Sequence, residues 1–152
     1  RPINPIHPTY RYQSHYLDCP NEPLYPFGFG LSYGNYIYED LRINLQKLRD
    51  CDKLLIEIDV FNDSGFIADE IVQCYIEAMF FSVSRPVNEL KRFKRISFKP
   101  YQRQTVSFVL TIDDFRAFNI DMIWTAEHHM YKVKVGPDSV DLLEKKIEIF
   151  DL

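Results

Sequence analysis

The chain has 152 residues, which is enough for one domain with a sizeable core. Its formal net charge of −4 gives no reason to expect nucleic acid or an anionic membrane as a partner. No apolar run reaches the roughly 18 to 20 residues that a membrane-spanning helix needs. The three cysteines Cys19, Cys51 and Cys74 lack a CxxC pair, which argues against a disulfide framework and a zinc site. Free thiols favour a cytoplasmic location, with a periplasmic or secreted one as the alternative.

Residues 1–35 are predicted to form an extended strap. Six of the nine prolines precede residue 27, and prolines this dense forbid a helix. The segment PLYPFGFGLSYGNYIY (23–38) carries no charge and six aromatic residues, whereas a disordered linker is poor in aromatics. We therefore expect the strap to lie over an apolar surface. The chain starts with Arg1-Pro2, as expected of a piece cut from a longer protein.

Regular alternation starts at Tyr36. The run YIYEDLRINL predicts a half-buried strand with its inward positions at Ile37, Leu41, Ile43 and Leu45. The run KLLIEIDVFN (53–62) predicts a second strand, whose core face is Leu54, Ile56, Ile58 and Val60. NDSG (62–65) is a turn signal.

Further strands follow at short intervals. EIVQCYIEAMFF (70–81) favours a strand because it is rich in Ile, Val, Tyr and Phe. LKRFKRISF (90–98) alternates, KPYQ (99–102) is a predicted turn, and RQTVSFVLTI (103–112) predicts a strand with Val106, Phe108, Leu110 and Ile112 inward. DDFRAFN (113–119) predicts one helical turn capped by Asp113.

The last predicted strands are 122–124, HMYKVKVG (129–136) and EKKIEIF (144–150). Seven or eight short strands separated by turns predict an all-β fold, an antiparallel immunoglobulin-like β-sandwich. We assign residues 36–152 to this sandwich and residues 1–35 to the strap.

Four blocks of the sequence resemble a known family. YLDCPNEPLYPFGFGLSY (16–33) resembles the entry into the C-terminal domain of glycoside hydrolase family 3 enzymes of the β-glucosidase type, which reads YxDxxxxPLYPFGYGLSY. VFNDSGFIADEIVQCYI (60–76), RPVNELKRFKRISFKPYQRQTVSFVL (85–110) and MYKVKVGPDSVDL (130–142) resemble three further motifs of that domain, in the same order. Together the blocks cover most of the chain.

This resemblance implies a fibronectin type III-like sandwich that is itself not catalytic. Family 3 enzymes place their nucleophilic Asp in a barrel and their acid/base Glu in an α/β domain, and both domains would precede Arg1. Retaining hydrolysis needs two carboxylates about 5 to 5.5 Å apart. We identify no pair of carboxylates in this chain as a candidate for that role. The longer protein is expected to hydrolyse O-glycosyl bonds, with no cofactor and no metal in this domain. Its catalytic domains are the expected partners of this one.

The chain departs from the family pattern at four glycines. Arg92, Tyr101 and Ala68 stand where the family has Gly, and a fourth Gly is replaced within residues 127–130. Because a non-Gly residue disfavours positive φ, we expect altered loops on an unchanged fold.

Three clusters of polar residues are candidates for chemistry. His128 and His129 beside Glu127 suggest a metal site, but neighbours on a strand point to opposite faces, so a polar turn is favoured. Asp113, Asp114 and Asp121 suggest a carboxylate pair, but capping of a helical turn is favoured. KRFKR (91–95) suggests an anion-binding stripe, and a solvated edge strand is favoured.

The strap residues have two competing interpretations. An aromatic, uncharged composition is typical of an interface core, so the candidates for an interface with the preceding domains are Tyr16, Leu24, Tyr25, Phe27, Phe29, Leu31 and Tyr33. The alternative is a carbohydrate-binding or protein-interaction module, in which these rings stack on a saccharide. Self-association of the isolated domain is a third possible outcome, because an exposed apolar patch tends to bind another protein surface.

Overall fold

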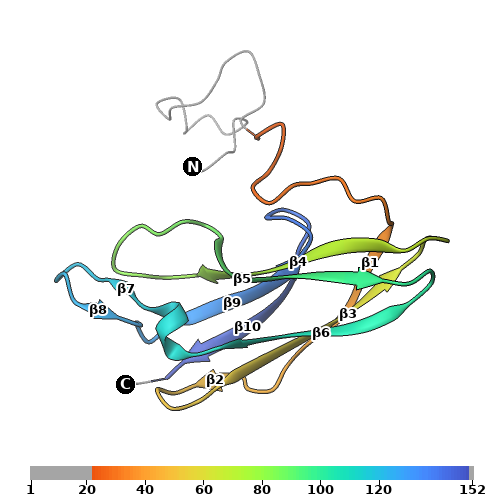
Figure 1. Cartoon of the computed structure of the whole chain (residues 1–152). Helices are drawn as coiled ribbons and strands as arrows, with labels where there is room; N and C mark the ends of the chain where they lie inside the picture. The colour runs from red at the N-terminus through yellow and green to blue at the C-terminus, as the bar shows by residue number, and fades with distance from the viewer. Residues whose placement is uncertain (1–21, 151–152) are drawn as a thin grey trace, which may run out of the picture.

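Two β-sheets pack face to face in the computed structural model, which describes residues 22–150 (Figure 1). One sheet has the strand order β1 (Tyr36–Ile43), β3 (Leu54–Asn62) and β6 (Arg103–Leu110). The other has the order β2 (Lys47–Leu48), β10 (Leu143–Ile149), β9 (Met130–Gly136), β4 (Ala68–Ala78) and β5 (Glu89–Phe98). β7 (Ala117–Phe118) and β8 (Trp124–Thr125) form a separate hairpin, preceded by a 3₁₀ turn, η2 (Ile112–Phe115).

The predicted antiparallel sandwich is confirmed. Seven strands of seven or more residues form its two layers, and among the described pairs only β2 with β10 is parallel. The longest predicted strand, residues 70–81, appears as β4 and ends at Ala78. Within the described residues, no helix is long and apolar enough to cross a membrane.

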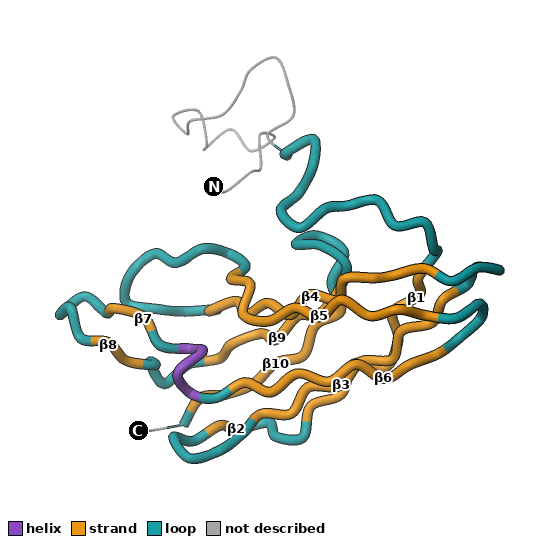
Figure 2. Tube along the Cα trace, in the orientation of Figure 1, coloured by secondary structure: helices purple, strands orange, loops and turns teal. Residues whose placement is uncertain are grey.

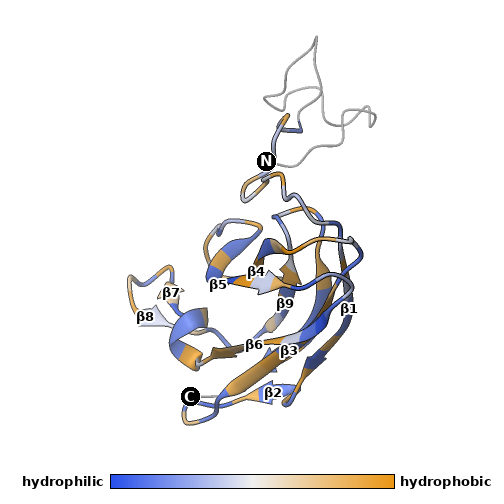
Figure 3. Ribbon diagram, turned by 45° about the vertical axis from the view of Figure 1, so that its right-hand side comes forward, coloured by the Kyte–Doolittle hydropathy of each residue, from blue (hydrophilic) through white to orange (hydrophobic). Residues whose placement is uncertain are grey.

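The core lies between the two sheets and follows the predicted alternation. Leu54, Ile56, Ile58 and Val60 on β3 are fully buried, and the predicted inward residues of β6 are buried as well. They pack against the inward residues of the other sheet, which are Val72, Cys74, Ile76, Tyr131, Val133, Val135, Ile147 and Ile149. Burying each large apolar side chain stabilises the fold by about 1.5 to 3 kcal/mol. Figure 3 shows hydrophobic and hydrophilic residues interspersed along the strands of both sheets.

The inward set predicted for the first strand is wrong at Ile37, which is 39% exposed. The pairing of β1 with β3 shifts register between Glu39 and Arg42, and Asp40 there has a φ of 53°. Such a bulge adds one residue and reverses which side chains face the core. Tyr36 and Tyr38 therefore pack on the core before the bulge, and Leu41 is buried after it.

The helical turn predicted at 113–119 is present but starts earlier. Its N-cap is Thr111, so the assignment of Asp113 as the cap is wrong. Asp114 accepts a hydrogen bond from the Thr111 backbone N–H (2.9 Å), while Phe115 is fully buried against Tyr131. The turn begins at Ile112 because burial of Ile112 and Phe115 fixes its position.

The four positions without the family's glycine differ in backbone geometry. Tyr101 keeps a left-handed conformation with a φ of 53°, whereas Ala68, Arg92 and residues 127–130 do not have positive φ. Buried Asn62 holds this end of the sandwich together, because its side-chain amide donates to the carbonyls of Phe66 and Lys99 (both 3.0 Å). The turn at 99–102 therefore keeps its path with a tyrosine at the strained position.

Candidate interdomain interface

The described part of the strap, residues 22–35, runs as a loop past the β9–β10 loop to the start of β1 and contacts β4 on the way (Figure 2). A turn at its centre is closed by the Phe29 N–H donating to the Pro26 carbonyl (3.0 Å). The Phe27 carbonyl accepts from the backbone N–H of Ser139 (2.9 Å), in the loop between β9 and β10. The strap is therefore attached to this domain through its main chain.

Gln73 on β4 provides the central anchor. Its side-chain amide donates to the carbonyls of Gly28 (3.0 Å) and Pro137, and it accepts a hydrogen bond from the Tyr75 hydroxyl. Gln73 is only 5% exposed and Tyr75 is fully buried, although both point away from the core between the sheets. The Phe27 ring meets the Tyr75 ring edge-on, at 6.4 Å between centroids.

Only glycine fits at position 28. Its φ is +81°, and a Cβ there would lie 2.2 Å from Gln73 Oε1 and 2.7 Å from the Tyr75 hydroxyl. The backbone can approach the sheet closely because no side chain intervenes. The Gly28 carbonyl can therefore accept a hydrogen bond directly from the buried Gln73 amide.

Glu70 forms a second anchor nearer the start of β1. Its carboxylate accepts hydrogen bonds from Ser32 Oγ (2.5 Å) and the Tyr38 hydroxyl (2.8 Å), and the residue is only 5% exposed. Burial, and then the charge of Glu70, raise the pKa of Tyr36 to about 12. The same two causes raise the pKa of Tyr38 further. Both phenols remain neutral and keep their protons at physiological pH.

The apolar side chains of the strap point outward. The interface candidates Tyr25, Phe27 and Phe29 are much more exposed than the core residues of the strands. Leu24, Leu31 and Tyr33 are more exposed still; the six fractions are Leu24 86%, Tyr25 67%, Phe27 67%, Phe29 44%, Leu31 92% and Tyr33 94%. The seventh candidate, Tyr16, lies outside the described residues. The main chain of the strap is bonded to the domain, while its large apolar side chains are largely exposed.

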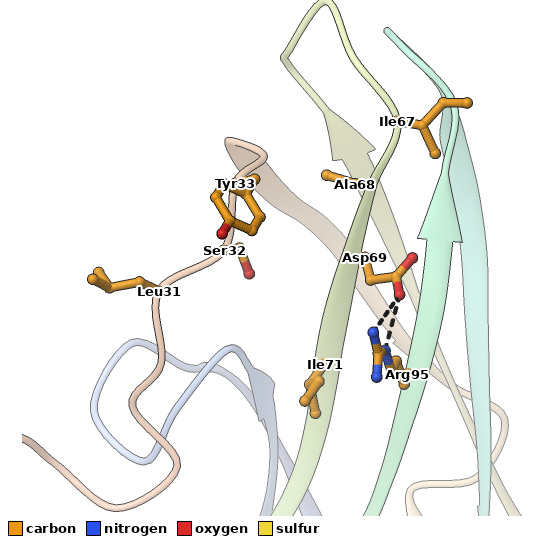
Figure 4. Close-up of a pocket in the computed structure, with 8 residues that line it drawn as sticks. All are labelled: Leu31, Ser32, Tyr33, Ile67, Ala68, Asp69, Ile71 and Arg95. Carbon is orange, nitrogen blue, oxygen red and sulfur yellow. Dashed lines mark hydrogen bonds and ion pairs between the residues drawn. The ribbon is translucent and has the colours of Figure 1, made fainter.

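A pocket of about 380 Å³ lies where the strap leaves β4 (Figure 4). Ser32 and Tyr33 border it from the strap, and Ile67 and Ile71 border it from the β4 side. An ion pair between Arg95 and Asp69 (2.7 Å) lies along one wall, and the hydrogen bond from Ser97 and then that from Arg95 lower the pKa of Asp69. The two charges offset each other, so the pocket offers apolar walls and hydrogen-bonding groups without net charge.

The other predicted clusters do not assemble into sites. His128 lies 3.6 Å from Glu148, and His129 lies 3.8 Å from Glu127, so the two imidazoles face different carboxylates. Residues 22–150 contain no group of three His, Cys, Asp or Glu side chains arranged to hold a metal ion.

The acidic and basic clusters pair with opposite charges. Asp113 pairs with Arg116 (2.7 Å) and Asp114 with Arg92 (2.8 Å), so these carboxylates do not face each other. KRFKR (91–95) belongs to β5, which is an edge of the five-stranded sheet, as favoured from its charges.

Sequence reasoning missed the anchors Gln73, Tyr75 and Glu70. The run IVQCYI (71–76) carried a signal, because it is nearly continuous in large side chains while other strands alternate. A strand of this kind is covered on both faces. The strap covers the outer face of β4 at Gln73 and Tyr75.

The middle of the chain matches a known domain family. A model of the fibronectin type III-like domain matches residues 70–139. Two curated relatives cover much more of the chain. The periplasmic β-glucosidase of Salmonella typhimurium is 35% identical over 98% of this chain and 19% of its own length. The β-glucosidase of Kluyveromyces marxianus is 38% identical over 90% of this chain and 16% of its own length.

A solved structure has the same fold. The β-glucosidase from Listeria innocua in complex with glucose superposes with a TM-score of 0.88 at 34% identity, covering 99% of this chain and 21% of that one. The chain thus spans about a fifth of the length of these relatives. The described thiols are free, with Cys51 exposed and Cys74 buried. A cytoplasmic location stays a prediction.

Proposed function

Because this chain belongs to the C-terminal fibronectin type III-like domains of family 3 glycoside hydrolases, we propose that it braces the catalytic domains of a β-glucosidase-like enzyme. The bracing surface is the outward side of the strap. The longer protein hydrolyses O-glycosyl bonds in carbohydrates with a retaining mechanism, and its two catalytic carboxylates lie in the domains before this one.

One observation carries this proposal. Main-chain carbonyls of the strap accept hydrogen bonds from Gln73 and Ser139, while Leu31 and Tyr33 are more than nine-tenths exposed. A segment that only closed the sandwich would turn its apolar side chains inward, since burial is what stabilises a fold. An uncharged set of aromatic and aliphatic residues on a fixed backbone is the composition of an interface core. Preorganisation also lowers the entropy lost on docking.

The proposal predicts that strap side chains stabilise the full-length enzyme and not the isolated domain. We would make Leu31→Ser with Tyr33→Ser in the full-length polypeptide and in residues 1–152. The control is Val109→Ser, which removes a 46% exposed side chain on the opposite sheet. Interface cores concentrate their energy in a few such residues. We expect the double variant to lower the melting temperature and the glucosidase activity of the full-length enzyme.

The same variant should leave the melting temperature of the isolated domain unchanged, and Val109→Ser should leave both proteins unchanged. A full-length enzyme that is insensitive to the strap substitutions would overturn the bracing role. Hydrolysis of a chromogenic glucoside by residues 1–152 alone would overturn the non-catalytic role.

A saccharide-binding function is the second candidate, and the geometry of two rings favours it. Tyr25 and Phe29 lie 5.3 Å apart between centroids with 32° between their planes, and both are exposed. Calorimetric titration of the isolated domain with cello- and xylo-oligosaccharides separates this function from bracing. Saturable binding that is lost in Tyr25→Ala or Phe29→Ala would favour the binding module. Sedimentation at increasing concentration measures the self-association expected of an uncovered strap.

A further inference from the structure

The β7–β8 hairpin has a tightly built turn. The Asn119 side-chain oxygen accepts hydrogen bonds from the backbone N–H groups of Asp121 (3.0 Å) and Ile123 (2.9 Å). The Met122 N–H donates to the Asn119 carbonyl (3.0 Å), and Met122 holds a φ of 60°. Non-glycine residues persist in this conformation when the surrounding structure fixes them. The tip of the hairpin is therefore a defined surface.

This surface is apolar and exposed. We define the hairpin patch as Phe118, Ile120, Met122, Ile123 and Trp124, whose exposed fractions run from 53% to 75%. The Phe118 and Trp124 rings meet at 5.0 Å with 60° between planes, so they do not form a flat platform. The patch adds no side chain to the buried core of the domain. Contiguous apolar patches of this kind mark interaction sites.

The hairpin patch is connected to the strap through two loops, residues 79–88 and the β9–β10 loop that carries Ser139. Near one end of the 79–88 loop, Ser82 Oγ accepts a hydrogen bond from the Ile120 N–H (3.2 Å). At its other end, the Asn88 side-chain amide donates to the Ser139 carbonyl (2.9 Å), and the Ser139 N–H donates to the Phe27 carbonyl of the strap (2.9 Å). Figure 1 shows the hairpin, the 79–88 loop and the strap following one another along one side of the sandwich.

Exposed apolar residues continue along this side between the two ends. Phe80 (66%) and Val87 (65%) lie on the loop, and Val140 (72%) follows Ser139. On the far side, the three-stranded sheet presents ion pairs such as Arg42 with Asp59 (2.9 Å) and Arg103 with Glu39 (2.6 Å). Exposed apolar side chains thus lie between the hairpin patch and the strap.

We propose that the hairpin patch is a second contact with the same body that covers the strap, the catalytic part of the longer polypeptide. This inference rests on the proposed function. The patch has five exposed apolar side chains, few beside the about 20 to 30 residues a side of a standard interface, so alone it is small for a dimer of this chain. The exposed side chains of the strap enlarge the surface. A saccharide is a poor occupant, because the Asn119 side-chain oxygen is already used by the turn.

Hydroxyl-radical footprinting of residues 1–152 and of the full-length polypeptide tests the inference. Met122 and Trp124 report on the hairpin patch, and Tyr25 and Phe27 report on the strap. Cys51, exposed in the turn between β2 and β3, is the control, and maleimide should label it equally in both proteins. We expect modification of both reporter pairs to slow by about fivefold or more in the full-length protein, as for side chains entering an interface core.

The outcomes separate the two proposals. Protection of the strap without Met122 and Trp124 would overturn this inference and leave the bracing role intact. Protection of neither pair would overturn both. A concentration-dependent protection of Met122 and Trp124 in residues 1–152 alone would assign the patch to a second copy and also overturn the inference. As a functional check, Ile120→Ser with Trp124→Ser should lower the melting temperature of the full-length protein, while Val109→Ser should not.

Discussion

Strand β3 and the described strap are both rich in large apolar residues, and they place them in opposite environments. In β3, Leu54, Ile56, Ile58 and Val60 are fully buried, and the backbone pairs with β1 and β6 on both sides. In the strap, the main chain contacts the domain at Gly28, and most of the large apolar side chains are exposed to solvent.

The difference teaches that hydrophobicity by itself does not identify a core. Alternation with a period of two marks β3 as one face of a sheet. Proline and glycine break that period in the strap, so its side chains cannot all point the same way inward. Apolar residues in such a segment cover another surface, and that surface need not belong to the same domain.

The largest expected loss of stability comes from removing apolar atoms from β3 rather than from the strap. Ile58→Ala should destabilise the isolated domain by about 3 kcal/mol, because it opens a cavity between the sheets. Leu31→Ala, a comparable loss of apolar atoms in the strap, should change the free energy of unfolding by less than about 0.5 kcal/mol. Urea denaturation measures both. Equal losses would show that strap side chains belong to the core of this domain.

A second variant breaks the attachment of the strap. Gly28→Ala places a Cβ against Gln73 in a left-handed backbone and should destabilise strap docking by about 2 kcal/mol. The Ser139 amide, which donates to Phe27, should then exchange its hydrogen about 30-fold faster. Gly30→Ala is the matched control, because a Cβ at Gly30 meets nothing within 4 Å. An unchanged Ser139 amide in Gly28→Ala would contradict the main-chain anchor.

The outer face opposite the strap should respond to pH. The hydrogen bonds from Arg42 and then Thr105 lower the pKa of Asp59 to about 2. A carboxyl whose pKa is lower in the folded state than its unfolded value of about 3.9 stabilises the protein above that pH and loses the effect toward pH 2. Asp59→Asn should therefore destabilise by about 1 kcal/mol at pH 6, a value reduced for solvent screening. The difference from the natural chain should shrink as the pH falls toward 2 and vanish below it.

The control for this pH effect is Asp121→Asn. No ion pair of the Asp121 carboxylate is found in the described part of the chain. Denaturation curves for this variant and the natural chain should run parallel between pH 6 and 2. A similar pH dependence in both variants would argue against the Arg42 contact as its source.

The smallest expected change in stability is at Tyr101, in the turn after β5. Like Gly28 in the strap, Tyr101 has a positive φ. Tyr101→Gly should stabilise the domain by about 0.5 kcal/mol, because relief of the left-handed strain exceeds the entropy that glycine loses on folding. Tyr101→Ala keeps the strain and should give no gain. Thermal unfolding of both variants measures the difference, and a loss of stability in Tyr101→Gly would mean that the exposed ring contributes more than the strain costs.

The strands and the core could be predicted from the sequence because their signals are local. Alternation at 54–60 and 106–112 identified buried residues one by one. The exception, Ile37, lies before a bulge that depends on how β1 pairs with β3. Pairing is a contact between distant segments, so no window around Ile37 contains it.

The candidate interface divides in the same way. Composition and family resemblance picked out the strap residues that prove to be exposed, from Leu24 to Tyr33. Their anchors stayed hidden, because Gln73 and Glu70 read as ordinary polar positions on a strand. Gln73 lies 45 residues from Gly28 along the chain, and only the folded sheet brings them together.

The sequence by itself determined the two-layer sandwich, its core faces and the distinct character of the strap, since periodicity and proline content act within a few residues. Tertiary structure alone decided which face of β4 the strap covers, which main-chain groups hold it, and which side chains remain free. It also joined the hairpin patch to the strap through residues 79–88 and the β9–β10 loop. The physical reason is that burial and hydrogen bonding between remote segments depend on three-dimensional neighbours, which spacing along the chain does not record.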